Sequence, residues 1–151
     1  MIVETSMNVA PETIRALDEA AQTAGTTRSA MLVLVMKKLL ERKKMSGNAF
    51  ARVKYQKRGG IWKRMHVSLE GRDYEYFLDM RKGFKFSVSF FVSLAVREYL
   101  EELLADIISN GNKIPDNYLF QEYIFFHDNE SPVTCWIFYW GIPGKLKKLF
   151  T

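Results

Sequence analysis

Residues 63–69 alternate between polar and apolar side chains. The apolar positions are Met65, Val67 and Leu69, and the polar positions are Arg64, His66 and Ser68. Successive side chains of a β-strand point to opposite faces, so this period of two predicts a strand with one face on a core and the other exposed. The same alternation occurs in residues 5–9, and each strand is followed by two helical segments. The chain is therefore expected to contain one structural unit written twice.

Of the two helical segments in the first unit, the second is the more apolar. Every residue of 30–36 is apolar, and exposing such side chains to water costs roughly 1.5–3 kcal/mol each. A helix that is apolar on nearly all sides belongs in a core. A helix-turn-helix needs a polar recognition face on its second helix, so that class is not expected here.

Local signals set the ends of these helices. Pro11 suits a first helical turn, Gly25 suits a left-handed C-terminal position, and Thr27 is an N-cap residue. With a constant offset of sixty positions, Thr27 corresponds to Ser87. The second unit is thus predicted to have helices over 73–81 and from 87 to about 108, with a stop at 110–112. Gly83 lies two places before the position matching Gly25, so this turn is expected to differ.

Positive charge is concentrated between the two units. The net charge is +5, but residues 41–64 hold nine Lys and Arg side chains and the single acidic residue Glu41. Because this charge precedes a strand with an exposed polar face, a surface for a polyanion is the favoured interpretation. A solvated basic linker is the alternative.

The strand–helix–turn–helix order resembles the ribbon-helix-helix family of Arc- and MetJ-type DNA-binding proteins. The residues that carry the resemblance are Met7-Asn8-Val9-Ala10-Pro11-Glu12 with Gly25-Thr26-Thr27-Arg28-Ser29, and Met65-His66-Val67-Ser68-Leu69 with Ser87-Val88-Ser89. Members of that family pair two chains, whose strands form an antiparallel ribbon in the DNA major groove. Two units in one chain imply a fused pseudo-dimer.

The resemblance implies a mainly α fold with a short antiparallel ribbon, and the aromatic runs on either side of the turn at 128–132 predict a small C-terminal β-hairpin. We therefore expect four parts: a first unit at 1–44, a basic linker or hairpin at 45–62, a second unit at 63–110, and an aromatic extension at 111–151. The implied function is sequence-specific binding of double-stranded DNA by a transcriptional regulator, with further self-association on DNA as an open option.

Candidate site residues follow by position. The outward strand residues expected to contact bases are Ser6, Asn8, Arg64, His66 and Ser68. Phosphate contacts are expected at the second-helix N-termini and along the basic segment, from Thr27, Arg28, Ser29, Ser87, Ser89, Arg52, Lys54, Lys57, Arg58 and Lys63. The first strand has no Lys or Arg and contains Glu4, which repels phosphate. Either the ribbon reads a non-palindromic site, or the first strand serves only the fold.

Two segments leave alternatives open. Residues 51–55 alternate, so 45–62 could add a strand beside 61–65 or form a basic arm on phosphates. The aromatic residues of 112–151 could be core, a surface for a partner protein, or a platform for stacked bases. The alternative functions are a protein-interaction module resembling an antitoxin and a protein that binds single-stranded nucleic acid or RNA.

The sequence offers little catalytic or metal chemistry. Cys135 is the only cysteine and has no companion at the spacing of metal ligands, and His66 and His127 lie far apart in sequence, so neither a disulfide nor a zinc site is expected. No phosphate loop or nucleophile motif occurs, and we predict neither enzymatic activity nor a cofactor. The longest apolar run ends at Arg97, and the first residues lack a signal-peptide pattern. A cytoplasmic, nucleoid-associated protein without a membrane partner is the expectation.

Overall fold

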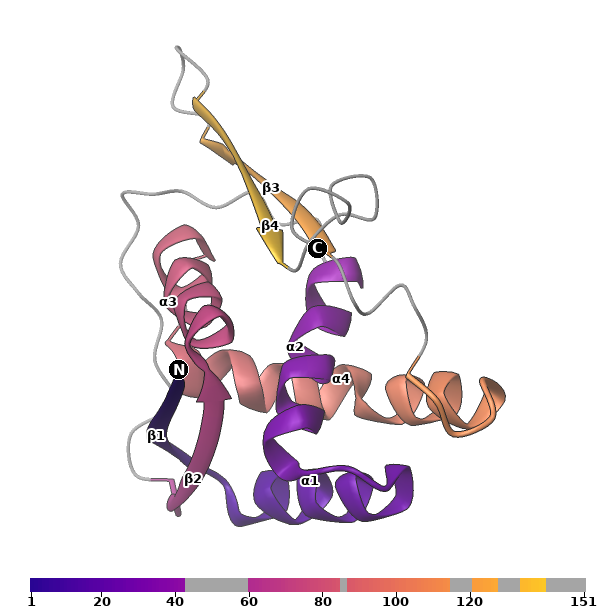
Figure 1. Ribbon diagram of the computed structural model, residues 1–151. Helices are drawn as coiled ribbons and strands as arrows, with labels where there is room; N and C mark the ends of the chain where they lie inside the picture. Colours follow the sequence, from indigo (N-terminus) through magenta and orange to yellow (C-terminus); the bar gives the residue numbers. More distant parts are fainter. Residues whose placement is uncertain (43–59, 85–86, 115–120, 128–133, 141–151) are drawn as a thin grey trace.

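The computed structural model describes residues 1–42, 60–84, 87–114, 121–127 and 134–140. The predicted fold class is confirmed in its broad form, because the described chain is mainly helical with a two-stranded antiparallel sheet (Figure 1). The elements in chain order are β1 (Ile2–Val9), α1 (Pro11–Ala24), α2 (Arg28–Arg42), β2 (Lys63–Glu70), α3 (Gly71–Phe84), α4 (Val88–Ser109), β3 (Gln121–His127) and β4 (Thr134–Trp140). None of the helices in the described part of the chain is both long and apolar enough to cross a membrane.

β1 and β2 pair antiparallel although more than fifty residues separate them in the sequence. Met7 lies opposite Met65, and Ser6 lies opposite His66. The apolar face of this ribbon is buried, whereas its polar face is exposed. β1 begins at Ile2, earlier than the alternation suggested, because Ile2 pairs with Glu70 through the backbone and needs no particular side chain.

The residue types at its two ends explain where α1 begins and where it ends. Pro11 occupies the first helical position, where its missing N–H costs nothing. Gly25 adopts the left-handed conformation with φ of 69°. The Gly25 N–H then donates to Gln22 O, and the Thr26 N–H donates to Ala21 O at 2.9 Å. This pair of bonds closes the C-terminal end of α1 as a Schellman motif.

The two predicted N-caps are confirmed. The Thr27 hydroxyl accepts a hydrogen bond from the Ala30 N–H at 3.1 Å, and the Ser87 hydroxyl accepts one from the Phe90 N–H at 3.2 Å. α4 ends at the predicted stop, where Gly111 and Asn112 both have positive φ. The same cap therefore starts α2 and α4, sixty positions apart.

Removal of either cap is expected to lower stability measurably. Thr27→Ala and Ser87→Ala each leave a first-turn N–H of a core helix without its side-chain acceptor, which costs about 0.5–2 kcal/mol. Urea unfolding of each variant measures the loss. Thr23→Ala is the matched control, because Thr23 is exposed within α1 and its hydroxyl donates to the Glu19 carbonyl of its own helix. Equal stability of the cap variants and the control would contradict this account.

α2 and α4 form the centre of the fold. α4 crosses α2, α1 packs below them, and the ribbon with α3 lies to one side (Figure 1). The largest fully buried side chains come from α1, α2, α3, α4 and β2: Leu17, Met31, Leu32, Met36, Leu39, Met65, Leu69, Phe77, Met80 and Phe91. The prediction that the apolar helix after Thr27 is a core helix is confirmed.

Other expectations are corrected or lie outside the described residues. α3 runs over Gly71–Phe84 instead of 73–81, and Gly83 lies inside the helix. Its early start follows from β2 passing directly into α3, with the Gly71 N–H donating to Met1 O at 2.8 Å. β3 and β4 pair antiparallel. The predicted extra strand at 51–55, the basic arm and the environment of the C-terminal aromatic side chains lie outside the described residues.

Candidate nucleic-acid interface

The exposed face of the β1–β2 ribbon carries all five residues predicted to contact bases. Residues directly opposite one another on this face form the pairs Ile2–Glu70, Glu4–Ser68, Ser6–His66 and Asn8–Arg64. Ser6, Asn8, Arg64, His66 and Ser68 are all exposed. The structure thus brings together side chains from two distant segments into one polar strip.

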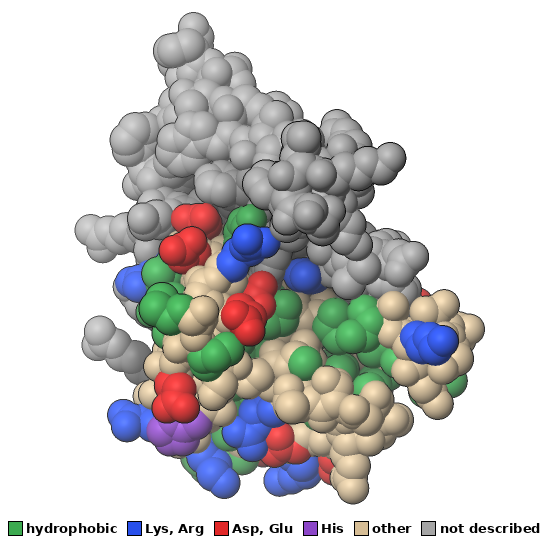
Figure 2. Space-filling model, in the orientation of Figure 1, with side chains coloured by type: hydrophobic (Ala, Val, Ile, Leu, Met, Phe, Trp, Pro, Cys, Tyr) green, Lys and Arg blue, Asp and Glu red, His purple; other side chains and the backbone are tan. Residues whose placement is uncertain are grey.

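The charges on this strip are unevenly distributed. Arg64 lies at one end beside Lys63, whereas Glu4 and Glu70 lie at the other end. In Figure 2, Lys and Arg side chains gather around the histidine at the lower edge of the molecule, with an acidic group just above it. Sequence reasoning noted Glu4 but missed Glu70. The sequence offset combined with antiparallel pairing could have indicated that both carboxylates share one end.

The N-terminus of α2 lies along the outer edge of β2. The Ser68 N–H donates to the Ser29 hydroxyl at 3.0 Å, and the Arg28 guanidinium donates to the His66 carbonyl at 3.3 Å. These contacts satisfy backbone groups that β1 does not reach, on the side of β2 away from its partner strand. Arg28 and Ser29 therefore position the strip, a role that sequence reasoning did not assign to them.

Arg28 is held mainly by Asp18 of α1. Its Nε lies 2.7 Å from Asp18 Oδ1, and its Nη2 lies 2.8 Å from Asp18 Oδ2. The two side chains thus form a bidentate ion pair. This hydrogen bonding lowers the pKa of the Asp18 carboxyl below its ordinary value, with smaller help from the charge of Lys63. A phosphate approaching Arg28 would have to share the guanidinium with Asp18. The predicted phosphate contact at Arg28 would therefore compete with the ion pair to Asp18.

Stability is expected to depend on the charge of Asp18. Because the folded pKa lies below the unfolded value of about 3.9, the pair stabilises the fold above that value, and the gain disappears as pH falls through the folded pKa. Asp18 is 46% exposed, so screening keeps the gain below about 1 kcal/mol. Urea unfolding of the native protein and Asp18→Asn should differ at neutral pH and converge as the pH falls through the folded pKa of Asp18. A difference that is constant with pH would contradict the prediction.

Of the remaining residues predicted to contact phosphate, four lie in the described part of the chain. Thr27 and Ser87 cap α2 and α4, and Ser89 lies in the first turn of α4 beside β1. Lys63 is exposed at the start of β2. The other four basic residues, Arg52, Lys54, Lys57 and Arg58, lie outside the described residues. Within the described part of the chain, no three His, Cys, Asp or Glu side chains are grouped to hold a metal ion.

Comparison of the chain with protein-family models, with curated proteins and with solved structures finds no match.

Proposed function

We propose that the protein binds double-stranded DNA sequence-specifically, as a regulator, by placing the β1–β2 ribbon in the major groove. The observation that supports this most is the single exposed strip on which Ser6, Asn8, Arg64, His66 and Ser68 meet. A major groove about 12 Å wide admits a two-stranded ribbon, and hydroxyl, amide, imidazole and guanidinium groups can all bond base edges there.

We further propose that the chain is a pseudo-dimer of two ribbon-helix-helix units. Ser6 and His66 are equivalent under the sixty-residue offset, and they also lie directly opposite each other in the ribbon. An antiparallel pairing of equivalent residues is what a two-fold axis through that pair produces. The matching caps at Thr27 and Ser87 support the same relation. The ribbon centre would then lie at Ser6 and His66.

The charge distribution favours a non-palindromic target. In this proposal Arg64 bonds a guanine and Asn8 bonds an adenine at one end of the ribbon. Glu4 at the other end accepts from a cytosine amino group, because a carboxylate there cannot approach phosphate favourably. The first strand would therefore contribute to reading. The alternative, in which it serves only the fold, predicts no change in sequence preference for Ser6→Ala or Asn8→Ala.

Selection from a random duplex library with the full-length protein tests the proposal. We expect one enriched, asymmetric sequence whose affinity falls steeply between about 50 and 200 mM salt, since about 0.9 counterions are released per phosphate neutralised. Single-stranded DNA and RNA of the same sequence serve as competitors. Failure to enrich any duplex, or stronger competition by a single strand, would overturn it.

A further inference from the structure

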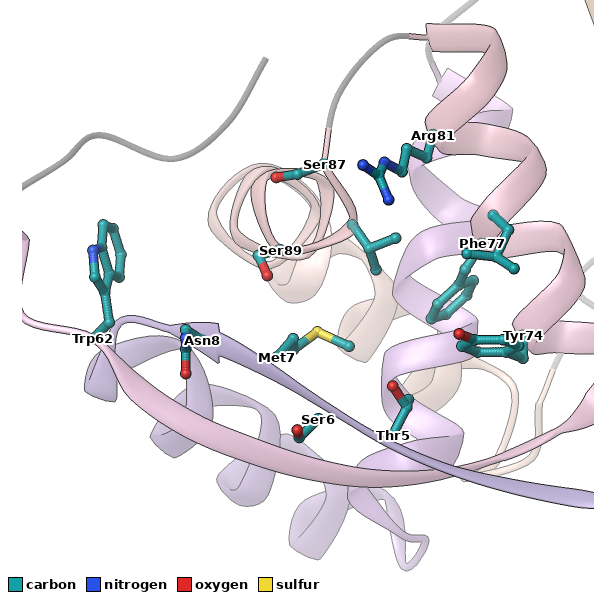
Figure 3. Close-up of a pocket in the computed structure, with 12 residues that line it drawn as sticks. Thr5, Ser6, Met7, Asn8, Trp62, Tyr74, Phe77, Arg81, Ser87 and Ser89 are labelled. Atoms are coloured by element: carbon teal, nitrogen blue, oxygen red, sulfur yellow. The ribbon is translucent and has the colours of Figure 1, made fainter. Parts of the chain in front are cut away.

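A cavity of about 510 Å³ lies on the outer side of β1, between that strand, α3 and the start of α4. Tyr74 and Phe77 point into it from α3, and Met7 points into it from β1 (Figure 3). Arg81, Ser87 and Ser89 border it above. Its volume is within the range of about 300–1,000 Å³ typical of small-molecule sites.

The cavity occurs where the two halves of the fold differ. Under the offset of sixty, Arg28 corresponds to Val88 and Asp18 corresponds to Leu78, and both Val88 and Leu78 line the cavity. In the first half, the ion pair of Arg28 and Asp18 lies beside β2. In the second half, a short apolar side chain replaces the long guanidinium, and space remains. In the proposed pseudo-dimer, the cavity thus lies where these two positions differ between the halves.

The lining has a definite chemical character. Arg81 is the only charged residue among the described residues that line it. Ser87 and Ser89 add hydroxyls at the N-terminus of α4, a helix of 22 residues with no acidic residue in its first turn. Trp62 and the half-buried Tyr74 supply flat apolar surfaces, and Phe77 also lines the cavity although it is only 2% exposed. A cation, hydroxyl donors and the positive end of a helix favour an oxyanion, and aromatic walls favour a planar ring.

We propose that this cavity binds a small planar aromatic molecule bearing one carboxylate or phosphate group. The oxyanion lies near Arg81 and Ser87, and the ring packs against Tyr74, close to the largely buried Phe77 and Met7. The site goes beyond the proposed DNA binding and can be tested without DNA, whereas the comparison of its lining with the first half rests on the proposed pseudo-dimer. Ser6 and Asn8 line the cavity and also lie on the exposed strip, so occupancy by the ligand is expected to alter duplex affinity if the ribbon binds DNA.

The first test is a titration of the full-length protein labelled with ¹³C at the methionine methyls. The probes are naphthalene-1-carboxylate, its neutral amide, and adenosine 5′-monophosphate, which separate an aryl carboxylate from a nucleotide. We expect at least one of the two anions to shift the Met7 methyl saturably through the ring current, whereas the fully buried Met31 methyl stays in place. The amide should bind roughly tenfold more weakly, because it lacks the charge-assisted bonds to Arg81.

Variants distinguish this cavity from other binding surfaces. Val88→Arg combined with Leu78→Asp places the ion pair of the first half into the second and should abolish the Met7 shift. Arg81→Ala alters an exposed side chain and should weaken anion binding roughly tenfold. Arg72→Ala, on the same helix but outside the cavity lining, is the control and should bind as the native protein does. Unchanged binding by Arg81→Ala or by the folded double variant, equal binding of the amide, or no Met7 shift with either anion would overturn the proposal.

Discussion

Replacing Asn8 and Arg64 together by Ala is expected to abolish discrimination between the selected duplex and a scrambled one. These residues lie opposite each other at the basic end of the exposed strip. A bidentate contact between such a side chain and a base contributes about 1–3 kcal/mol to the discrimination against a wrong base. Loss of both contacts should therefore reduce the difference in binding free energy between the two duplexes by roughly 2–6 kcal/mol. Fluorescence anisotropy with the two duplexes measures the difference.

The control for this variant must remove charge without altering the strip. Arg72→Ala does so, because Arg72 is exposed on α3 and outside the ribbon. It should lower affinity for both duplexes equally or leave it unchanged. Urea unfolding should show that the double variant keeps its stability, since both side chains are exposed. Full discrimination by the folded double variant would remove the ribbon from the proposed interface.

Lys38→Ala is expected to be the most destabilising substitution of a charged residue in the described chain. Lys38 is 2% exposed, and its Nζ lies 2.9 Å from Asp106 Oδ2 and 3.4 Å from Glu102 Oε1. Both carboxylates belong to α4, so this group ties α2 to α4 at the centre of the fold. Breaking a buried ion pair costs about 3–5 kcal/mol, and the lost packing of the lysine stem adds to it. Because the carboxylates remain partly hydrated, we expect the lower end of that range.

Two further variants separate packing from charge at this position. Lys38→Met keeps most of the side-chain volume, so it should be less destabilising than Lys38→Ala. Arg97→Ala is the control, because that side chain is 73% exposed and should change stability by less than about 0.5 kcal/mol. Urea unfolding of all three gives the comparison. A cost for Lys38→Ala as small as that for Arg97→Ala would show that the buried pair does not hold the helices together.

The local elements could be predicted from the sequence because their causes lie within a few residues. Alternation predicted both strands of the ribbon, Pro11 and Gly25 predicted the ends of α1, and Thr27 and Ser87 predicted the caps. The apolar run after Thr27 predicted a core helix, since no other position could keep those side chains from water. Where the local signal was incomplete, the prediction was wrong: α3 starts earlier because of a bond to Met1, a contact distant in sequence.

The tertiary structure alone decided which groups face one another. The sequence determined that residues 5–9 and 63–69 have a polar face, but the register that places Asn8 opposite Arg64 and Glu4 near Glu70 depends on pairing between distant segments. Arg28 is a second example. As an arginine at a helix N-terminus it was predicted to contact phosphate, but in the folded chain it donates to the Asp18 carboxylate and to the His66 carbonyl of β2. The cavity beside β1 likewise depends on packing, because its lining comes from β1, Trp62, α3 and the start of α4, which are distant in sequence. Side-chain periodicity is a property of the local backbone, whereas partners are set by the packing of the whole chain.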